Sequence, residues 1–202
     1  MPRRDLAFEP GMFCHVVNRG VDREPIFLRQ ADYEFFLHGI TRFFPSQSIS
    51  VVAYCLMPNH YHLLLRLEED VLSRVIQRLT MSFSLAMNLR RRRTGPLFTG
   101  RFRSVAVRSD EQLIHTSAYV HLNPVAAGLV ESPVKWPYSS YRAYLGGRSR
   151  VRVDPSPVLE LFGTEGPPGG RPYNAASASY RRYVEDLAPG ALRLREPRTA
   201  EP

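Results

Sequence analysis

The sequence is poor in cysteine, in lysine and in long apolar runs. Its 202 residues hold two cysteines, Cys14 and Cys55, and no Cys-x-x-Cys pair. The chain therefore offers no cysteine set for a zinc ribbon and no thioredoxin-like site, and we expect two buried free thiols. No stretch approaches the roughly 20 apolar residues of a membrane span, and the first residues form no apolar signal region. We expect a cytoplasmic protein without a membrane partner.

Acidic residues are also scarce relative to basic ones. The chain has 27 Lys and Arg against 19 Asp and Glu, which gives a net charge of +8, and nearly all of the positive charge is arginine. A guanidinium group binds phosphate through two parallel hydrogen bonds and stays charged at every relevant pH. This excess favours a polyanionic partner, with nucleic acid first. The alternative is a generally arginine-rich composition, so motifs must decide.

Apolar periodicity predicts an α+β protein. Alternating or continuous apolar runs indicate strands at residues 12–18, 49–57, 60–67 and 101–108. Three- and four-residue spacing indicates helices at residues 31–44, 71–92 and 111–125, the last with Asp110 as its N-cap. The order β-α-β-β-α-β, then a helix, is typical of the ferredoxin-like split βαβ fold, a four-stranded antiparallel sheet with helices on one face. Because this fold serves many functions, the function must come from a site.

The composition changes near residue 146, where Gly146-Gly147-Arg148 has the character of a linker. We therefore expect a first domain over residues 1–145 and a C-terminal extension over residues 146–202. The extension is predicted to be partly helical, at residues 154–162 and 177–187. Its Gly/Pro-rich segment 163–172 and the last dozen residues are predicted to be irregular.

Two histidines stand at the head of the third predicted strand. His60 and His62 follow the turn Pro58-Asn59 and are separated by Tyr61. Since side chains alternate faces along a strand, the two imidazoles point to one face and the tyrosine to the other. Two imidazoles side by side can hold one cation. The structural alternative is a pair of hydrogen-bonded core histidines.

A second group of polar residues lies on the last predicted helix of the first domain. Tyr119 and Asn123 are four residues apart and so share a helix face. An amide oxygen at Asn123 can complete a metal site begun by the histidines, and a tyrosine one turn away can act as a covalent nucleophile. Without the histidines, the simpler interpretation is a packed aromatic ring and a polar residue at the helix end.

Arginines cluster before and within the fourth predicted strand, and a few more follow the first strand. They are interleaved with Phe98 and Phe102, a pattern that fits a surface binding the nucleic-acid backbone while bases stack on aromatic rings. A solvated helix end is the alternative for the run of four arginines. The candidate DNA-binding residues are Arg19, Arg23, Arg90, Arg91, Arg92, Arg93, Arg101 and Arg103.

Taken together, these motifs resemble a known family, the REP-associated tyrosine transposases. This family is a branch of the single-strand DNA transposases that carry a histidine-hydrophobic-histidine (HUH) motif and one catalytic tyrosine. The resemblance runs over about residues 11–145 and rests on five blocks in the right order. The blocks are HVVNRG at 15–20, MPNHYH at 57–62, GPLFTGRF at 95–102, YVHLNPVAAGLV at 119–130 and WPYSS at 136–140.

The resemblance implies a role for each site residue. His60, His62 and Asn123 would hold a divalent cation, Mg or Mn, and two imidazoles suit Mn better. Tyr119 would attack a phosphodiester of single-stranded DNA, keep the 5′ phosphate as a phosphotyrosine and release a 3′ hydroxyl. The expected partner is single-stranded DNA that folds into a repeat hairpin, and the protein is expected to act as a monomer or as a homodimer with swapped tyrosine helices.

The chain departs from the family pattern at a few positions. Tyr61 is a bulky residue between the histidines, and Ala126 stands where many relatives have an arginine, so one DNA or packing contact is in question. The tail after about residue 150 matches no pattern, and autoinhibition by it is one hypothesis.

Three other functions stay open. A non-catalytic hairpin-binding protein on the same fold would lack metal-dependent chemistry. A replication-initiation-type nickase usually has further tyrosines or a helicase part, for which this chain is short. A zinc site at His60 and His62 would need cysteine partners, which no other motif supplies.

Overall fold

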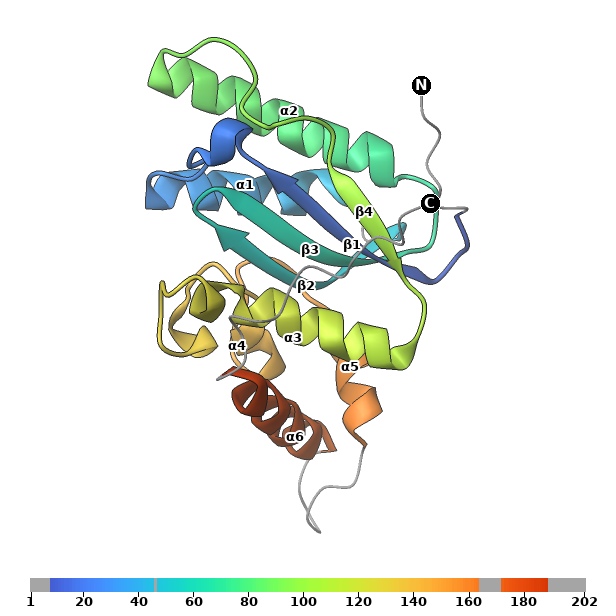
Figure 1. The fold of residues 1–202 in the computed structure, drawn as a ribbon. Coiled ribbons are helices and arrows are strands. Elements are labelled where there is room, and N and C mark those ends of the chain that lie inside the picture. The colour runs from blue at the N-terminus through green and yellow to red at the C-terminus, as the bar shows by residue number, and fades with distance from the viewer. Residues whose placement is uncertain (1–7, 46, 164–171, 189–202) are drawn as a thin grey trace.

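The computed structural model describes residues 8–45, 47–163 and 172–188, and it contains one four-stranded sheet (Figure 1). The strand order is β2-β3-β1-β4, and every neighbouring pair is antiparallel. This arrangement confirms the predicted ferredoxin-like pattern. The strands are β1 Met12–Arg19, β2 Ile49–Met57, β3 His60–Leu67 and β4 Arg103–Val107.

Helices α1 (Gln30–Phe43) and α2 (Leu72–Arg91) cover one face of the sheet (Figure 1). Their apolar stripes meet strand residues that point to this face, such as Tyr61, whose ring lies 4.9 Å from that of Phe36. Burial of these large side chains supplies the main driving force for closing this layer. The two helices therefore take the positions expected of the helices inside a split βαβ pattern.

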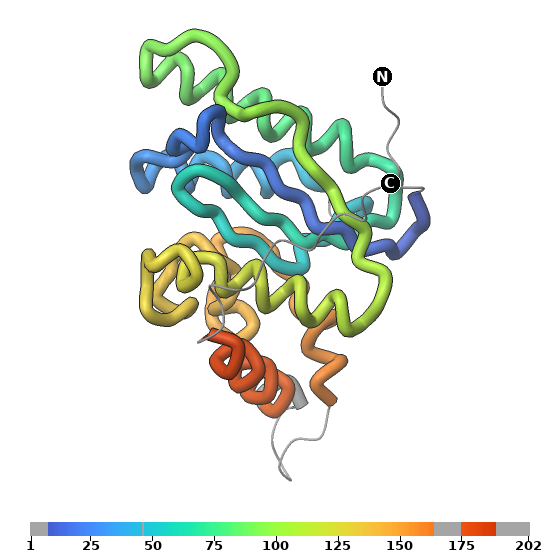
Figure 2. Tube along the Cα trace, in the orientation of Figure 1, coloured from blue at the N-terminus to red at the C-terminus, as the bar shows by residue number. Residues whose placement is uncertain are grey.

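Helix α3 (Asp110–Ala126) covers the opposite face of the sheet and runs back from the end of β4 (Figure 2). Its N-cap is Ser109, whose Oγ accepts a hydrogen bond from the backbone N–H of Gln112 at 3.2 Å. The prediction of Asp110 as the cap was wrong by one residue, because the serine hydroxyl reaches this N–H first. The helix includes Pro124 and ends before Gly128, which takes a positive φ of 68°.

Most of the remaining short elements gather on the α3 side of the sheet (Figure 1). The backbone N–H of Asp154 donates to the carbonyl of Val51, which brings the segment after the predicted linker back to the edge strand β2. The boundary between residues 145 and 146 stays a prediction. These elements are η2 Pro133–Lys135, α4 Tyr141–Tyr144, α5 Ser156–Leu159, η3 Glu160–Phe162 and α6 Pro172–Leu187. The short helix η1 Val21–Arg23 lies apart from them, directly after β1 and near α1 (Figure 1).

A buried polar network ties α6 to α3. His121 is fully buried, with Nδ1 2.7 Å from Tyr180 Oη and Nε2 2.8 Å from Ser140 Oγ. Tyr180 Oη donates in turn to Ser117 Oγ at 3.1 Å. Each polar atom of the imidazole thus has a partner, which offsets the cost of removing it from water.

Several boundaries differ from the predicted ones. β4 is shorter than predicted and begins at Arg103, and α6 begins at Pro172 rather than near residue 177. Cys14 and Cys55 are buried free thiols, as expected. Most of the predicted irregular segment 163–172, and the last dozen residues, lie outside the described residues. Among the helices that the structure describes, none is long and apolar enough to cross a membrane.

Candidate metal and tyrosine site

Strand β3 presents His60 and His62 on the face of the sheet that α3 covers. Their ring centroids lie 4.9 Å apart, while Tyr61 is buried on the other face, as strand alternation predicts. The turn before β3 is held by backbone hydrogen bonds, from Gly20 N–H to the Asn59 carbonyl and from Ile26 N–H to that of Pro58, both 2.8 Å. These bonds fix where the strand starts and hence where the imidazoles lie.

Helix α3 brings Tyr119 and Asn123 to the same place. The ring of Tyr119 lies 5.4 Å from that of His62 and is nearly perpendicular to it, at 89°. The Nδ2 of Asn123 donates to the backbone carbonyl of Tyr119 at 2.7 Å, and its side chain interacts with both His60 and His62. The Asn123 side chain favours the protonated form of both imidazoles, as an accepting amide oxygen does, which indicates that its oxygen faces them. The structure therefore assembles all four of these site residues within one chain.

The two histidines are uncharged at neutral pH. Burial lowers the pKa of His60 to about 4, with a further lowering by the positive charge of Arg19. Burial also holds the pKa of His62 well below its usual value, and the neighbouring His15, His60 and Arg19 act in the same direction. The Asn123 side chain opposes these effects without cancelling them. Neutral imidazoles keep the lone pairs that metal coordination requires.

The His62 Nε2 atom provides a test of whether these residues fit a metal ion. It is buried and has no hydrogen-bond partner among the described residues. An unpartnered buried nitrogen normally costs free energy, and a cation would remove that cost. With His60 and the Asn123 oxygen beside it, the donor set is two nitrogens and one oxygen, which suits Mn or Mg with water in the open positions. Across the described residues, no group of three or more His, Cys, Asp or Glu is arranged to hold a metal.

His15 also lies at this site, although it was not among the predicted site residues; it is the first residue of the HVVNRG block. It lies on β1, is buried, and its Nε2 is 2.9 Å from Nδ1 of His62. The planes of the two imidazoles are nearly parallel, at 13°, with centroids 5.1 Å apart, and the Tyr119 ring lies 5.9 Å from that of His15 at 82°. The signal that would have found it is strand alternation, which places His15, Val17 and Arg19 on one face of β1.

A small cavity of about 270 Å³ opens beside the histidines. It is built on Val17 of β1, which pairs with His62 on one side and Arg103 on the other. Arg19 stands directly opposite His60 in the strand register. Three candidate DNA-binding residues thus line one cavity next to the site, and its lining is Val17, Asn18, Arg19, Thr99, Gly100, Arg101 and Arg103.

The four consecutive arginines at the end of α2 lie in different environments. Arg91 reaches back to the start of α1, where its guanidinium donates to Asp32 Oδ2 at 2.9 Å and to the carbonyl of Ile26 at 2.6 Å. Arg90 lies over the ring of Phe35 at 5.0 Å, and its side chain is half exposed. Arg92 ends the helix with a φ of 50°, and Arg93 donates to the carbonyl of Pro96 at 3.2 Å. Arg90 also faces Asp32, at 3.7 Å, but Arg91 is closer and more buried and therefore makes the main contact between the end of α2 and the start of α1.

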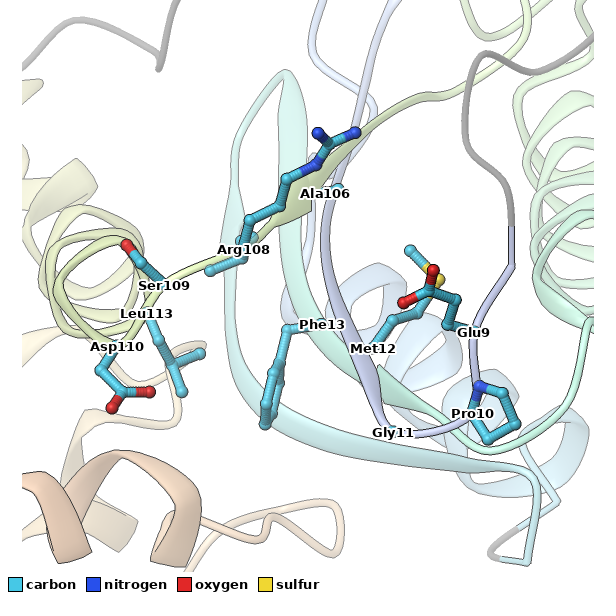
Figure 3. A pocket seen from close by; sticks show the side chains of 11 residues that line it. Glu9, Pro10, Gly11, Met12, Phe13, Ala106, Arg108, Ser109, Asp110 and Leu113 are labelled. Atoms are coloured by element: carbon cyan, nitrogen blue, oxygen red, sulfur yellow. The ribbon is translucent and has the colours of Figure 1, made fainter.

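A larger cavity lies away from this site (Figure 3). It has a volume of about 650 Å³ and is bounded by the start of β1, the end of β4 and the start of α3. Its charged lining residues are Glu9, Arg108 and Asp110, and none of the histidines or Tyr119 borders it. Size alone does not locate the chemistry in this protein.

The chain is similar in sequence to known proteins. A family model described as "Transposase IS200 like" matches residues 10–123, a span that includes His60, His62, Tyr119 and Asn123. A protein of Haemophilus influenzae described as a REP-associated tyrosine transposase is 33% identical over 101 residues, or 45% of this chain. That match spans 57% of the length of the relative.

One solved structure resembles the fold, and a second gives a weaker match. The structure of a REP-associated tyrosine transposase bound to a REP hairpin superposes with a TM-score of 0.62 at 20% identity, over 76% of this chain and 92% of the other. A transposase structure from Deinococcus radiodurans gives a TM-score of 0.40 at 14% identity, over 55% of this chain and 91% of the other. The first likeness independently supports the fold described above.

Proposed function

Because the chain belongs to the family of IS200-like transposases, we propose that it nicks and joins single-stranded DNA at repeat hairpins, with Tyr119 as the nucleophile. The observation that carries this proposal is the meeting of Tyr119 and His62, 5.4 Å apart, beside His60 and Asn123.

The cleavage step exchanges one phosphorus–oxygen bond for another. The Oη of Tyr119 attacks the phosphorus of a phosphodiester, and the bond from phosphorus to the 3′ oxygen breaks. The phenol loses its proton and the released 3′ oxygen gains one, so the products are a 5′ phosphotyrosine and a 3′ hydroxyl. Strand joining reverses the step with a different 3′ hydroxyl. No oxidant or other co-reactant is consumed.

His60, His62 and Asn123 are proposed to hold a divalent cation, Mn or Mg. When bound, such a cation supplies Lewis-acid polarisation of a phosphate oxygen. The part played by the chain is to present neutral nitrogens and one amide oxygen, and to hold Tyr119 at their edge. Helix α3 carries both Tyr119 and Asn123, so the position of the nucleophile is tied to that of the third ligand.

The arginine-lined cavity gives the DNA backbone a path to the site. Arg19, Arg101 and Arg103 border the cavity. Two of its lining residues, Val17 and Arg19 of β1, pair with His62 and His60 of the neighbouring strand β3. Arginine contacts of this kind hold phosphates and orient the strand without reading its sequence. A hairpin substrate is proposed because a structurally similar transposase was solved bound to a REP hairpin.

A covalent-trapping assay tests the proposed reaction. The protein is incubated with labelled single-stranded DNA that carries a repeat hairpin, with Mn, with Mg or with a chelator, and separated on a denaturing gel. We expect a metal-dependent adduct that Tyr119→Phe abolishes while hairpin binding survives. The matched control is Tyr183→Phe, because Tyr183 lies on α6 and contacts His115. This variant should form the adduct as the wild type does.

Two results would count against this function. An adduct that persists in Tyr119→Phe would exclude Tyr119 as the nucleophile. Salt-sensitive hairpin binding without an adduct under any metal condition would favour the non-catalytic binding protein. Removal of only residues 189–202 in the same assay, which keeps the buried Tyr180 and its contact with His121, would then separate lack of activity from inhibition by those residues.

A further inference from the structure

We infer that His15 is a positioning residue of the metal site, which holds His62 through Nδ1 so that Nε2 faces the cation. This inference rests on the proposed function and goes beyond it, because His15 is not one of the proposed ligands. The observation is the buried contact of 2.9 Å between His15 Nε2 and His62 Nδ1.

The direction of this hydrogen bond determines which nitrogen of His62 carries its proton. A neutral imidazole carries one N–H, so a hydrogen bond between these two nitrogens has one donor and one acceptor. If His62 donates from Nδ1, its Nε2 keeps a lone pair and can bind a cation. If His15 donates instead, the His62 Nε2 carries the proton and cannot be a ligand. Only the first arrangement turns the unpartnered Nε2 into a metal ligand.

The other histidine of the site is anchored in the same manner. His60 Nδ1 lies 2.7 Å from Oδ1 of Asn59, and this oxygen can only accept, so Nδ1 of His60 carries its proton. Both imidazoles are thus held at Nδ1 by a neighbour, and both have Nε2 left for coordination. This shared arrangement is what a supporting shell around a metal site requires.

His15 itself is suited to accept rather than to bind the cation. Its Nε2 is already engaged by His62, and the described residues contain no three-histidine group arranged to hold a metal. The contact of 2.9 Å joins His15 Nε2 to the nitrogen of His62 that is not the unpartnered one, so His15 holds the ring from the side opposite to the proposed cation. The Tyr119 ring closes the remaining side of His15.

Two substitutions in the full-length protein separate the hydrogen bond from the ring. His15→Phe keeps an aromatic ring but removes the acceptor, whereas His15→Gln keeps an acceptor and removes the ring. Binding of Mn²⁺ is followed by electron paramagnetic resonance, with the exposed His38→Gln of α1 as control. We expect His15→Phe to weaken Mn²⁺ binding about 10- to 100-fold, and His15→Gln and His38→Gln to stay near the wild type.

The tautomer of His62 is measured independently by ¹⁵N NMR of the metal-free protein. We expect the proton on Nδ1 in the wild type and in His15→Gln, and a shift toward Nε2 in His15→Phe. The inference is overturned if His62 carries its proton on Nε2 in the wild type, or if His15→Phe binds Mn²⁺ as tightly as the wild type. If the wild type binds no Mn²⁺ at all, the proposed metal site fails, and the wild-type tautomer still decides the role of His15.

Discussion

The ring of Tyr119 stands edge-on to the imidazole of His62, with centroids 5.4 Å apart, and both side chains belong to the same copy of the chain. In a swapped dimer the tyrosine helix would instead serve the histidines of the partner. The contact places the proposed nucleophile and a proposed metal ligand on α3 and β3 of one molecule, and α3 is further tied to α6 through His121 and Tyr180. If each chain completes its own site, two variants that each lack a different site residue should not restore each other's activity when mixed.

We expect no recovery of activity when Tyr119→Phe is mixed with His62→Ala. Each variant lacks one part of the site, and a chain that completes its own site cannot borrow the missing part from a neighbour. The measurement is adduct formation on labelled hairpin DNA after co-expression or mixing. Recovery of a substantial share of wild-type adduct would show that the tyrosine helix is exchanged between copies.

The second prediction concerns Arg91, which differs from the arginines around it. Arg91→Ala should lower the free energy of unfolding by about 2–4 kcal/mol, because it leaves the buried carboxylate of Asp32 without its closest cation. The matched control is Arg90→Ala, whose guanidinium is 3.7 Å from Asp32 and half exposed, with an expected loss within about 1 kcal/mol. Urea unfolding of both variants is the measurement, and equal losses would refute the structural role of Arg91.

The sequence predicted those features of the site that depend on local geometry. Strand alternation was enough to predict that His60 and His62 lie on one face of their strand and Tyr61 on the other. Helix spacing was enough to predict that Tyr119 and Asn123 share one face of their helix. That these two faces meet depends on α3 crossing to the opposite side of the sheet, which is a long-range property. The family resemblance, and not periodicity, supplied that expectation.

His15 and Arg91 show where reasoning from sequence stops. A single histidine in an apolar strand has the same pattern whether it packs in the core or supports a neighbouring imidazole, and only the pairing of β1 with β3 distinguishes these cases. A run of four arginines suggests one shared role, but consecutive helical residues point about 100° apart. Arg91 therefore turns toward α1 while Arg90 lies over Phe35.

The third prediction tests the arginine-lined cavity as a DNA contact. Arg101→Ala and Arg103→Ala should each weaken binding of single-stranded DNA and reduce the slope of log K against log salt by about 0.7, the value for one neutralised phosphate. Arg181→Ala is the control, because Arg181 is paired with Glu185 on α6 at 2.8 Å. Fluorescence anisotropy at several salt concentrations gives the slopes. Unchanged slopes in the cavity variants would mean that the strand runs elsewhere.

The fourth prediction links the buried His121 to stability in acid. Burial lowers the pKa of His121 to about 3, whereas an unfolded histidine has a pKa of about 6.5. Between these values the unfolded chain binds a proton that the folded chain excludes, so the free energy of unfolding falls as the pH falls. The loss is about 1.4 kcal/mol per pH unit below 6.5 for each such histidine.

The measurement is urea unfolding of the metal-free protein between pH 7 and pH 5. His121→Gln should be less stable at pH 7, since it disturbs the contacts with Tyr180 and Ser140, yet its stability should fall less steeply with decreasing pH. The difference in slope should approach about 1.4 kcal/mol per pH unit, equal to one proton, toward pH 5, while the exposed His38→Gln keeps the wild-type slope. If His121→Gln and the wild type lose stability in parallel, His121 takes up its proton in the folded state, and the network around Tyr180 must accommodate an imidazolium.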